Sequence, residues 1–390
     1  MVLDPPFRYN TAIVLHRREF LLSSAAALAT ALSQKADAAP TSAKGEWRNR
    51  QSGMSYRQLG RTGFMISEVV MGGNTIAPDN YEHVLMAMDM GLNYLDTAPA
   101  YGNTKSELGY AKVIAARKRD SFFLNTKISV WDINRNKLYK DIYDSLPEFD
   151  RKKLDHLAEA ELERRQALNP DYLGMYFPSQ TVELRASALS NVMEKTYGPK
   201  INRGKNYKQI ILDSLDQSLQ RLGTDHVDLL MCPHGASTPA ELLNHPEIFE
   251  AFEVIKKQGK ARHFGVSAHN DPAGILEAAV RANAYSAAMV AFSIVNRPWT
   301  EKAVEHARKN DLGVIAMKVA RPVFNGRNNG TPDDPKRVQL IQDAVPGPLK
   351  VPQKAYLWAL RNPNLSGVIS ELVNAGMVKD NLPLAAPKSA

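Results

Sequence analysis

The chain has almost no cysteine. Cys232 is the only one among 390 residues, so no disulfide can form within the chain. Zinc and iron–sulfur sites built from several cysteines are excluded as well. Cys232 stands in an apolar run, where a lone cysteine usually acts as a small core residue.

Long hydrophobic runs are also missing. The run from Phe20 to Leu32 is mildly apolar and shorter than the roughly 20 residues that span a bilayer. It follows the pair Arg17 and Arg18, and the small residues 36–38 fit a cleavage site after it. This order resembles a twin-arginine export signal. A disordered or amphipathic cytoplasmic extension is the alternative.

The export interpretation divides the chain and gives it a location. Residues 1–38 would be the signal peptide, 39–53 a solvated leader and 54–390 the folded part. The export machinery of the twin-arginine route would be a partner, and the mature protein would be periplasmic with no stable membrane anchor. Without export the protein would be cytoplasmic.

Charge of one sign does not dominate the sequence. The formal net charge is +8, with lysines and arginines scattered among acidic residues, so no basic stripe indicates nucleic acid. The glycine motifs G-x-G-x-x-G after the first strand and G-x-x-x-x-G-K-[ST] are absent. The metal-binding spacings H-x-H and H-E-x-x-H are absent too, and no metal site is expected.

Strand-length apolar runs alternate with helical patterns from Met54 onward. A hairpin is expected around the turn Gly60 to Gly63. The predicted strands then cover residues 68–71, 92–95, 122–126, 227–231, 263–266, 287–292, 313–317 and 367–369. Eight such repeats predict an α/β fold, a closed (β/α)8 TIM barrel. A doubly wound open sheet is the alternative.

A long segment interrupts this alternation. Residues 131–205 are highly charged, and EFDRKKLDHLAEAELERRQAL within them is strongly helical. The stretch NPDYLGMYFPSQ then reads as an aromatic-rich loop. Because the segment follows the carboxyl end of a predicted strand, it would lie at the active-site face of a barrel. A helical insertion that acts as a lid, an interaction surface and simple decoration all remain open.

Polar residues follow three consecutive predicted strands. Asp96 ends the second, with Tyr101 in the loop after it, Lys127 ends the third, and His234 follows the fourth. A free phenol has a pKa near ~10, and an adjacent ammonium would lower it. A carboxylate would fix that ammonium, and a histidine could orient a carbonyl oxygen. A phenol in such a site can give its proton to a carbonyl oxygen as hydride reaches the carbonyl carbon.

At these residues the chain resembles the aldo-keto reductases. The resemblance covers about residues 54–130 and 205–385, and its most specific part is DTAPAYG followed by FFLNTK. It implies a barrel with a nicotinamide cofactor across its mouth. It also implies Tyr101 as general acid, Lys127 as the group that adjusts its pKa, Asp96 as partner of the lysine and His234 as orienting group.

The implied cofactor contacts are less complete. The resemblance places them at Gly72, Asn74 and Ser267, while Met289 stands where a carboxamide-binding glutamine is common. An extra residue, Pro233, also precedes His234 and makes its position less secure.

The expected phosphate-binding end departs further. Members that hold a 2′-phosphate have a lysine and an arginine where this chain has Glu371 and Met377, and only Asn381 keeps its match. Lys318, at the end of the seventh strand, could meet a phosphate or the substrate. Because a carboxylate beside a phosphate is unfavourable, the cofactor would be NAD(H) or NADP(H) with a doubtful preference for the latter.

Three functions follow from these patterns. The first is an exported oxidoreductase of EC 1.1.1 type that acts on a small-molecule carbonyl or alcohol, such as a sugar or polyol. The second is a non-catalytic binding protein on the same barrel with a degraded cofactor site. The third is a metal-dependent isomerase or hydrolase that uses His234, His269 and a carboxylate such as Asp96.

Overall fold

The computed structural model describes residues 45–324 and 334–387 of the chain. Its centre is a closed barrel of eight parallel strands in the order β10-β11-β4-β5-β6-β7-β8-β9. The strands are β4 (Val69–Met71), β5 (Tyr94–Asp96), β6 (Phe123–Lys127), β7 (Val227–Met231), β8 (Ala261–Ala268), β9 (Ala287–Ala291), β10 (Gly313–Met317) and β11 (Gly367–Ser370). The predicted TIM barrel is therefore confirmed. The open-sheet alternative is wrong, because β11 pairs with β4 and closes the ring.

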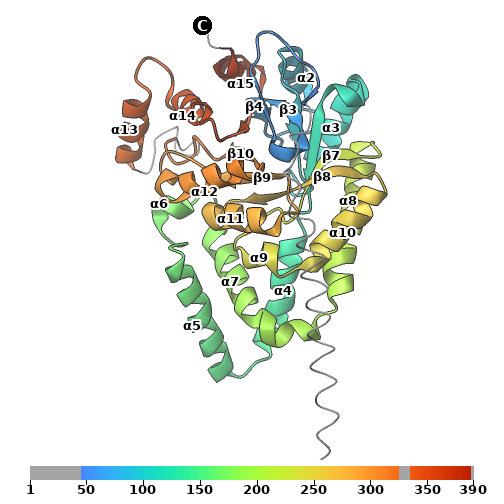
Figure 1. Ribbon diagram of the computed structural model, residues 1–390, viewed down its shortest axis with the longest axis vertical. Helices are drawn as coiled ribbons and strands as arrows, with labels where there is room; N and C mark the ends of the chain where they lie inside the picture. The colour runs from blue at the N-terminus through green and yellow to red at the C-terminus, as the bar shows by residue number, and fades with distance from the viewer. Residues whose placement is uncertain (1–44, 325–333, 388–390) are drawn as a thin grey trace, which may run out of the picture. The chain divides into compact units, whose positions relative to one another are not determined.

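Helices surround the barrel and connect its strands (Figure 1). They are α2 (Glu82–Asp89), α3 (Lys105–Ala116), α8 (Ile210–Leu222), α9 (Ala240–Leu243), α10 (Pro246–Lys257), α11 (Pro272–Ala282), α12 (Arg297–Lys309), α13 (Pro335–Ala344), α14 (Val351–Leu360) and α15 (Ala375–Asn381). Buried aliphatic side chains on their inner faces pack against the outward residues of the strands. This is the apolar stripe that the three-and-four spacing of the sequence predicts.

The predicted hairpin closes the amino-terminal end of the barrel. Strands β2 (Tyr56–Gln58) and β3 (Phe64–Ser67) are antiparallel, and a short 3-10 turn, η1 (Gly60–Thr62), joins them. A further strand, β1 (Glu46–Trp47), pairs in parallel with β3. It lies within the stretch for which a solvated leader is predicted. A strand of two residues leaves no periodic pattern, and tertiary contacts such as the 3.1 Å ion pair of Arg48 with Asp228 hold it in place.

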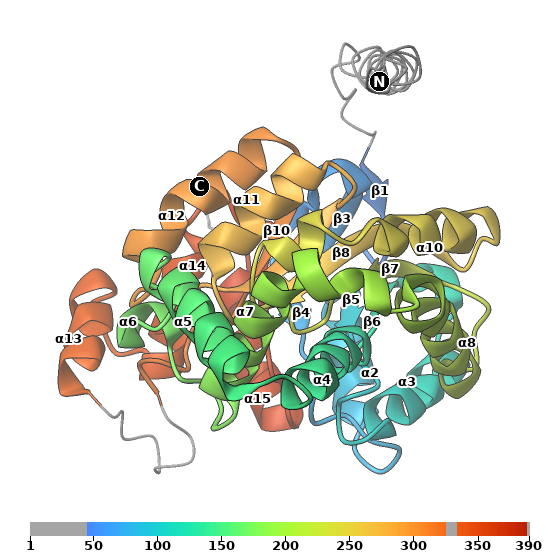
Figure 2. The ribbon, with the colours of Figure 1, turned by 90° about the horizontal axis from the view of Figure 1, so that it is seen from below.

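Residues 131–205 contain helices, as predicted. They are α4 (Trp131–Asp144), α5 (Glu148–Arg164), α6 (Pro170–Leu173), α7 (Gln180–Tyr197) and the turn η3 (Gly198–Lys200), followed by a π-helical turn, η4 (Gly204–Gln209), before α8. Helices α4, α5 and α7 lie at the opposite end of the barrel from β3, as Figures 1 and 2 show. Helices α5 and α7 share a small apolar core that includes Leu162 and Leu184.

The stretch expected to be an aromatic-rich loop is partly helical. Asn169 caps the short helix α6 by accepting hydrogen bonds from the backbone of Asp171 and Tyr172, and Gly174 ends it in the left-handed conformation. An asparagine cap before proline and a glycine after the last turn are ordinary helix signals.

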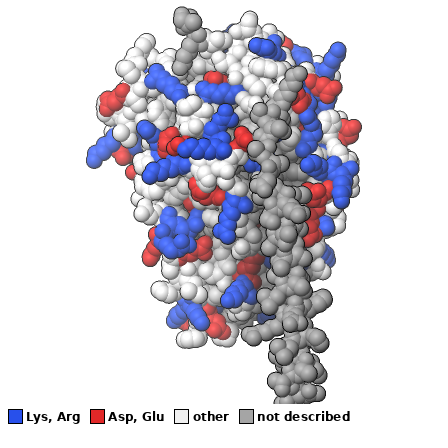
Figure 3. Space-filling model, in the orientation of Figure 1, with Lys and Arg blue, Asp and Glu red and all other residues white. Residues whose placement is uncertain are grey.

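The surface charge and the character of the helices bear on possible contacts with nucleic acid and membranes. On the face drawn in Figure 3, lysines and arginines alternate with acidic side chains without a single-sign stripe. In residues 45–324 and 334–387, no helix has the length and apolar character needed to cross a membrane.

Candidate active site

The carboxyl ends of the parallel strands meet at one mouth of the barrel. Successive side chains of a strand point to opposite faces, and the barrel interior holds Tyr94, Phe123 and Met231 among other apolar residues. Asp96 follows Tyr94 by two positions, and Lys127 follows Phe123 by four. Both side chains are therefore directed into the barrel at its mouth, and both are fully buried.

Lys127 connects the predicted catalytic residues. Its Nζ donates to Asp96 Oδ1 at 2.5 Å, to the backbone carbonyl oxygen of Thr97 at 3.0 Å and to the hydroxyl oxygen of Tyr101 at 3.1 Å. Asn125 donates from Nδ2 to the same oxygen of Asp96 at 2.5 Å. The structure thus brings Asp96, Tyr101 and Lys127 together, with the ammonium between the carboxylate and the phenol.

Burial and charge act in opposite directions on this ion pair. Burial raises the pKa of Asp96 and lowers that of Lys127, while each partner's charge counteracts the shift of the other. A buried charge is tolerated only beside its partner and with further hydrogen bonds. Asn125 and the Thr97 carbonyl supply those bonds.

The pKa of Tyr101 does not follow the sequence expectation. Burial raises it well above the usual 10, and the carboxylates of Asp96 and Glu371 raise it further. The net shift of this pKa is therefore upward, because desolvation of a buried phenolate outweighs the nearby ammonium when a carboxylate already pairs with that ammonium.

His234 lies beside Tyr101 despite the extra Pro233. The centres of the two rings are 5.6 Å apart in an edge-to-face arrangement. Ser129 Oγ is 2.6 Å from His234 Nδ1. Burial, then Lys127 and His269, hold the pKa of His234 well below 6.5, so its imidazole is neutral at neutral pH.

Three other residues at this mouth were not singled out as catalytic. Asn125 and Ser129 are each two positions from Lys127, so they share its face of β6 and of the residues that follow. This spacing alone predicts that they point into the mouth. Asp132 lies three residues after Ser129, in the first turn of α4, against Gly235 in the loop of His234. Burial and the carboxylate of Glu241 raise the pKa of Asp132 to about 7. No sequence signal marks Asp132.

Comparison with known proteins decides the family. The model of the aldo/keto reductase family matches residues 68–170 and 189–386. The chain belongs to the aldo/keto reductase family. The unmatched residues 171–188 comprise most of α6, the loop after it and the first half of α7.

Individual relatives are distant. The uncharacterized oxidoreductase YqkF of Bacillus subtilis is 22% identical over 353 residues, which are 85% of this chain and 91% of the relative. The aldo-keto reductase YhdN of the same organism is 27% identical over 173 residues, 42% of this chain and 49% of YhdN.

Solved aldo-keto reductases have the same fold. The holo form of AKR11C1 from Bacillus halodurans matches with a TM-score of 0.55 at 20% identity, covering 86% of this chain and 92% of that one. An aldo-keto reductase from Klebsiella pneumoniae, in complex with NADPH, matches with a TM-score of 0.54 at 16% identity, over 85% and 89% of the two chains.

The predicted cofactor residues of this aldo/keto reductase are dispersed around the mouth. Ser267 is buried near the end of β8 and Asn74 is exposed after β4. Lys318 is half-buried directly after β10, with a φ of 60°. Gly72 also has a packing role, since a Cβ there would lie 3.0 Å from the carbonyl oxygen of Ser370.

Two predicted residues after β11, Asn381 and Glu371, differ in burial. Asn381 is buried in α15 and donates from Nδ2 to Ser370 Oγ at 3.3 Å. Glu371 is exposed directly after β11, yet close enough to Tyr101 to raise its pKa. The carboxylate of Glu371 therefore acts on the predicted catalytic residues as well.

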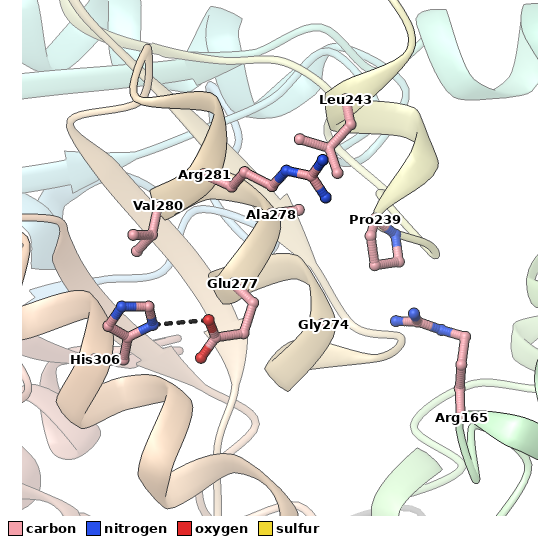
Figure 4. Close-up of a pocket in the computed structure, with 9 residues that line it drawn as sticks. All are labelled: Arg165, Pro239, Leu243, Gly274, Glu277, Ala278, Val280, Arg281 and His306. Atoms are coloured by element: carbon pink, nitrogen blue, oxygen red, sulfur yellow. Dashed lines mark hydrogen bonds and ion pairs between the residues drawn. The ribbon is translucent and has the colours of Figure 1, made fainter.

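A surface pocket lies apart from the predicted catalytic residues. A pocket of about 460 Å³ on the outside of the barrel is lined by α9, α11, α12 and Arg165 (Figure 4). Within it, a hydrogen bond of 2.7 Å joins His306 Nδ1 and Glu277 Oε2. None of the four predicted catalytic residues lines this pocket.

Within the part of the chain that the structure describes, no group of three or more His, Cys, Asp or Glu residues could hold a metal ion.

Proposed function

We propose that this aldo/keto reductase transfers hydride between a nicotinamide cofactor and a small carbonyl or alcohol, with Tyr101 as its proton donor and acceptor. The observation that carries the proposal is the position of the Lys127 ammonium, 2.5 Å from Asp96 and 3.1 Å from the Tyr101 hydroxyl. A buried lysine held by a carboxylate against a phenol has a clear chemical use in moving that phenol's proton.

The residues of the mouth fit a nicotinamide cofactor in part. Ser267, Lys318 and Asn381 would hold it, and a related structure contains NADPH. The buried Met289 offers no hydrogen bond to a carboxamide. The cofactor would supply the hydride, and the chain's own residues supply binding and proton transfer.

Tyr101 would give its proton to the substrate oxygen during carbonyl reduction. An alkoxide is a much stronger base than a phenolate, so the transfer is favourable even with the raised pKa of Tyr101. The ammonium of Lys127 stabilises the phenolate that remains. In alcohol oxidation the same atoms accept the proton.

His234 would orient the substrate oxygen. Its imidazole is neutral, so only one ring nitrogen carries a proton. If the Ser129 hydroxyl donates to Nδ1 across the 2.6 Å contact, the proton lies on Nε2. Nε2 can then donate a hydrogen bond to the same oxygen that Tyr101 protonates.

Glu371 supports a preference for NAD(H). Its carboxylate stands where relatives that bind a 2′-phosphate carry a cation, and like charges repel by a few kcal/mol at about 4 Å in a surface environment. We predict that Glu371→Lys lowers the Kd of NADPH about tenfold or more relative to that of NADH.

Fluorescence titration of both dinucleotides would measure this ratio. Glu371→Gln, which removes the charge without reversing it, should give an intermediate value. An unchanged NADPH to NADH ratio in Glu371→Lys would show that this residue does not face the 2′-position.

We further propose that the protein is exported with its cofactor bound. The sequence order around Arg17 and Arg18 supports a twin-arginine route, which carries folded proteins, and these residues lie outside those the structure describes. Since free nicotinamide pools are not expected in the periplasm, the cofactor would be retained and recycled by paired substrates.

A non-catalytic binding protein is the second candidate, favoured by Met289, Met377 and Glu371 at the cofactor end. The metal-dependent alternative has no candidate site among the described residues. To decide, the mature chain is purified from periplasm and examined by mass spectrometry and absorbance. Bound nucleotide, or saturable NAD(H) or NADP(H) binding with turnover of carbonyls, is expected. An empty chain that binds neither nucleotide would contradict the proposed function.

A further inference from the structure

The loop between α6 and α7 is fixed to the barrel by polar contacts. Gln180 donates from Nε2 to Asn270 Oδ1 at 3.0 Å, and the Tyr172 hydroxyl donates to Asp271 Oδ1 at 2.7 Å. Arg165 also pairs with Asp271. Asn270 and Asp271 lie in the loop after β8, the strand that carries Ser267. Residues 165–180 are therefore anchored on a loop at the mouth of the barrel.

His269 is the side chain of that loop which faces the catalytic residues. It follows Ser267 by two positions and so continues the inward face of β8. Burial, followed by the charges of Lys318 and Lys127, lowers its pKa to about 3. Lys127 also lowers the pKa of His234, so both imidazoles lie near the same ammonium. Its position two residues after Ser267 places this neutral imidazole of His269 at the same mouth as the predicted catalytic residues.

Phe177 covers this imidazole from the anchored loop. The centres of the two rings are 5.3 Å apart and their planes meet at 83°. The ring centre of Tyr176 is 6.2 Å from that of the same imidazole, and Tyr176 is buried. Phe177 itself is half-buried, and its neighbour Met175 is 52% exposed. An apolar surface at the mouth thus comes from a segment that the family model does not match.

We propose that Phe177, positioned by His269, forms one wall of the substrate site and selects substrates with a planar apolar group beside the reacting carbonyl. The proposal rests on the proposed function of the same mouth. An aromatic ring beside an aromatic substrate group gains both buried area and a favourable ring contact. A sugar or polyol would gain neither and would leave its hydroxyls facing a phenyl ring.

The test compares an aromatic and a hydroxylated probe. Steady-state kcat/KM is measured for 4-nitrobenzaldehyde and for glyceraldehyde in the wild type, Phe177→Ala and Phe177→Leu. We expect Phe177→Ala to lose about tenfold or more with 4-nitrobenzaldehyde and to change little with glyceraldehyde. Phe177→Leu, which keeps apolar volume without a ring, should lie between. Phe149→Ala is the matched control, because Phe149 also lies within residues 131–205 but is 79% exposed at the start of α5.

Binding is measured separately so that loss of catalysis cannot hide the result. Isothermal titration with 4-nitrobenzyl alcohol should show binding to the wild type and to Phe149→Ala, and weaker binding to Phe177→Ala with unchanged circular dichroism. An equal effect of Phe177→Ala on both aldehydes, a preference of the wild type for glyceraldehyde, or no binding of the aromatic alcohol would overturn the proposal. Turnover of neither aldehyde, with the aromatic alcohol still bound through Phe177, would count against the proposed function alone.

Discussion

Asp96 and Lys127 act as one unit at the scale of single residues. Both are buried, and each keeps the other charged against the cost of desolvation. Removal of one partner therefore changes the ionisation of the other more than it changes the shape of the site. A change in the ionisation of Lys127 would alter the hydrogen bond of the Tyr101 hydroxyl, because Lys127 Nζ is its donor.

Asp96→Asn should move the alkaline limb of the pH–rate profile to lower pH. The carboxylate of Asp96 raises the pKa of Lys127, so its loss allows the ammonium to lose its proton at lower pH. If activity needs the ammonium, kcat/KM should fall about 10²-fold at neutral pH and decline further as pH rises.

The measurement is kcat/KM between pH 6 and 10 for both proteins. Asp89→Asn serves as control, since Asp89 pairs with Arg117 at the surface. An Asp96→Asn profile that is lower but has the wild-type alkaline limb would mean that Lys127 does not set this limb.

The sequence predicts which residues gather at the site but not their ionisation. Asp96, Lys127 and His234 follow neighbouring strands, so their meeting follows from the barrel itself. The direction of the Tyr101 pKa depends on burial and on Glu371, which is 270 positions away along the chain. Neither is visible in a local motif.

At the scale of elements, a buried arginine joins α4 and α7 to the barrel. Arg135 is fully buried and donates to Asn191 Oδ1 at 2.6 Å and to His245 Nε2 at 3.0 Å. Its guanidinium is also 3.9 Å from the buried carboxylate of Glu241. This network fixes the helices that carry the loop of Phe177.

Arg135→Met should destabilise the protein by about 3–5 kcal/mol, because it leaves a buried carboxylate without its cation while keeping the apolar volume. Urea unfolding followed by circular dichroism measures the change. Lys137→Met on the same helix removes an exposed pair with Asp141 and should cost no more than about 1 kcal/mol. Equal effects of the two variants would contradict a structural role for the network.

The eight barrel strands were predictable because each is a short apolar run between turn signals. Helix α5 was predictable from its charged helical composition. Strand β1 was not, since two residues are too few for a period to show, and helix α6, with four residues, is marked only by its cap signals at Asn169 and Gly174. Tertiary contacts of Arg48 and Tyr172 stabilise them instead.

At the scale of the whole molecule, the fold and the route of export are separate questions. The closed barrel and the family are established by the topology and by the family match. The proposed export would depend on the first residues of the chain, which lie outside those described. The sequence predicts the export route from the order of its charged, apolar and small residues alone.

Replacement of Arg17 and Arg18 by lysine should stop export, because the twin-arginine route reads the guanidinium pair as an address. Fractionation of cells that express the tagged chain, followed by immunoblotting, measures the periplasmic share. Arg8→Lys, outside the pair, is the control. Equal periplasmic shares of the paired variant and the wild type would rule out this route.

The most direct test of the account is Tyr101→Phe, which removes one hydroxyl from the site. The reduction of 4-nitrobenzaldehyde is followed in a single turnover by the loss of reduced nicotinamide absorbance, with the Kd of the dinucleotide measured beside it. We predict a rate loss of about 10²–10⁴-fold with an unchanged Kd. A rate within a few-fold of the wild type would contradict the assignment of Tyr101 as the proton donor.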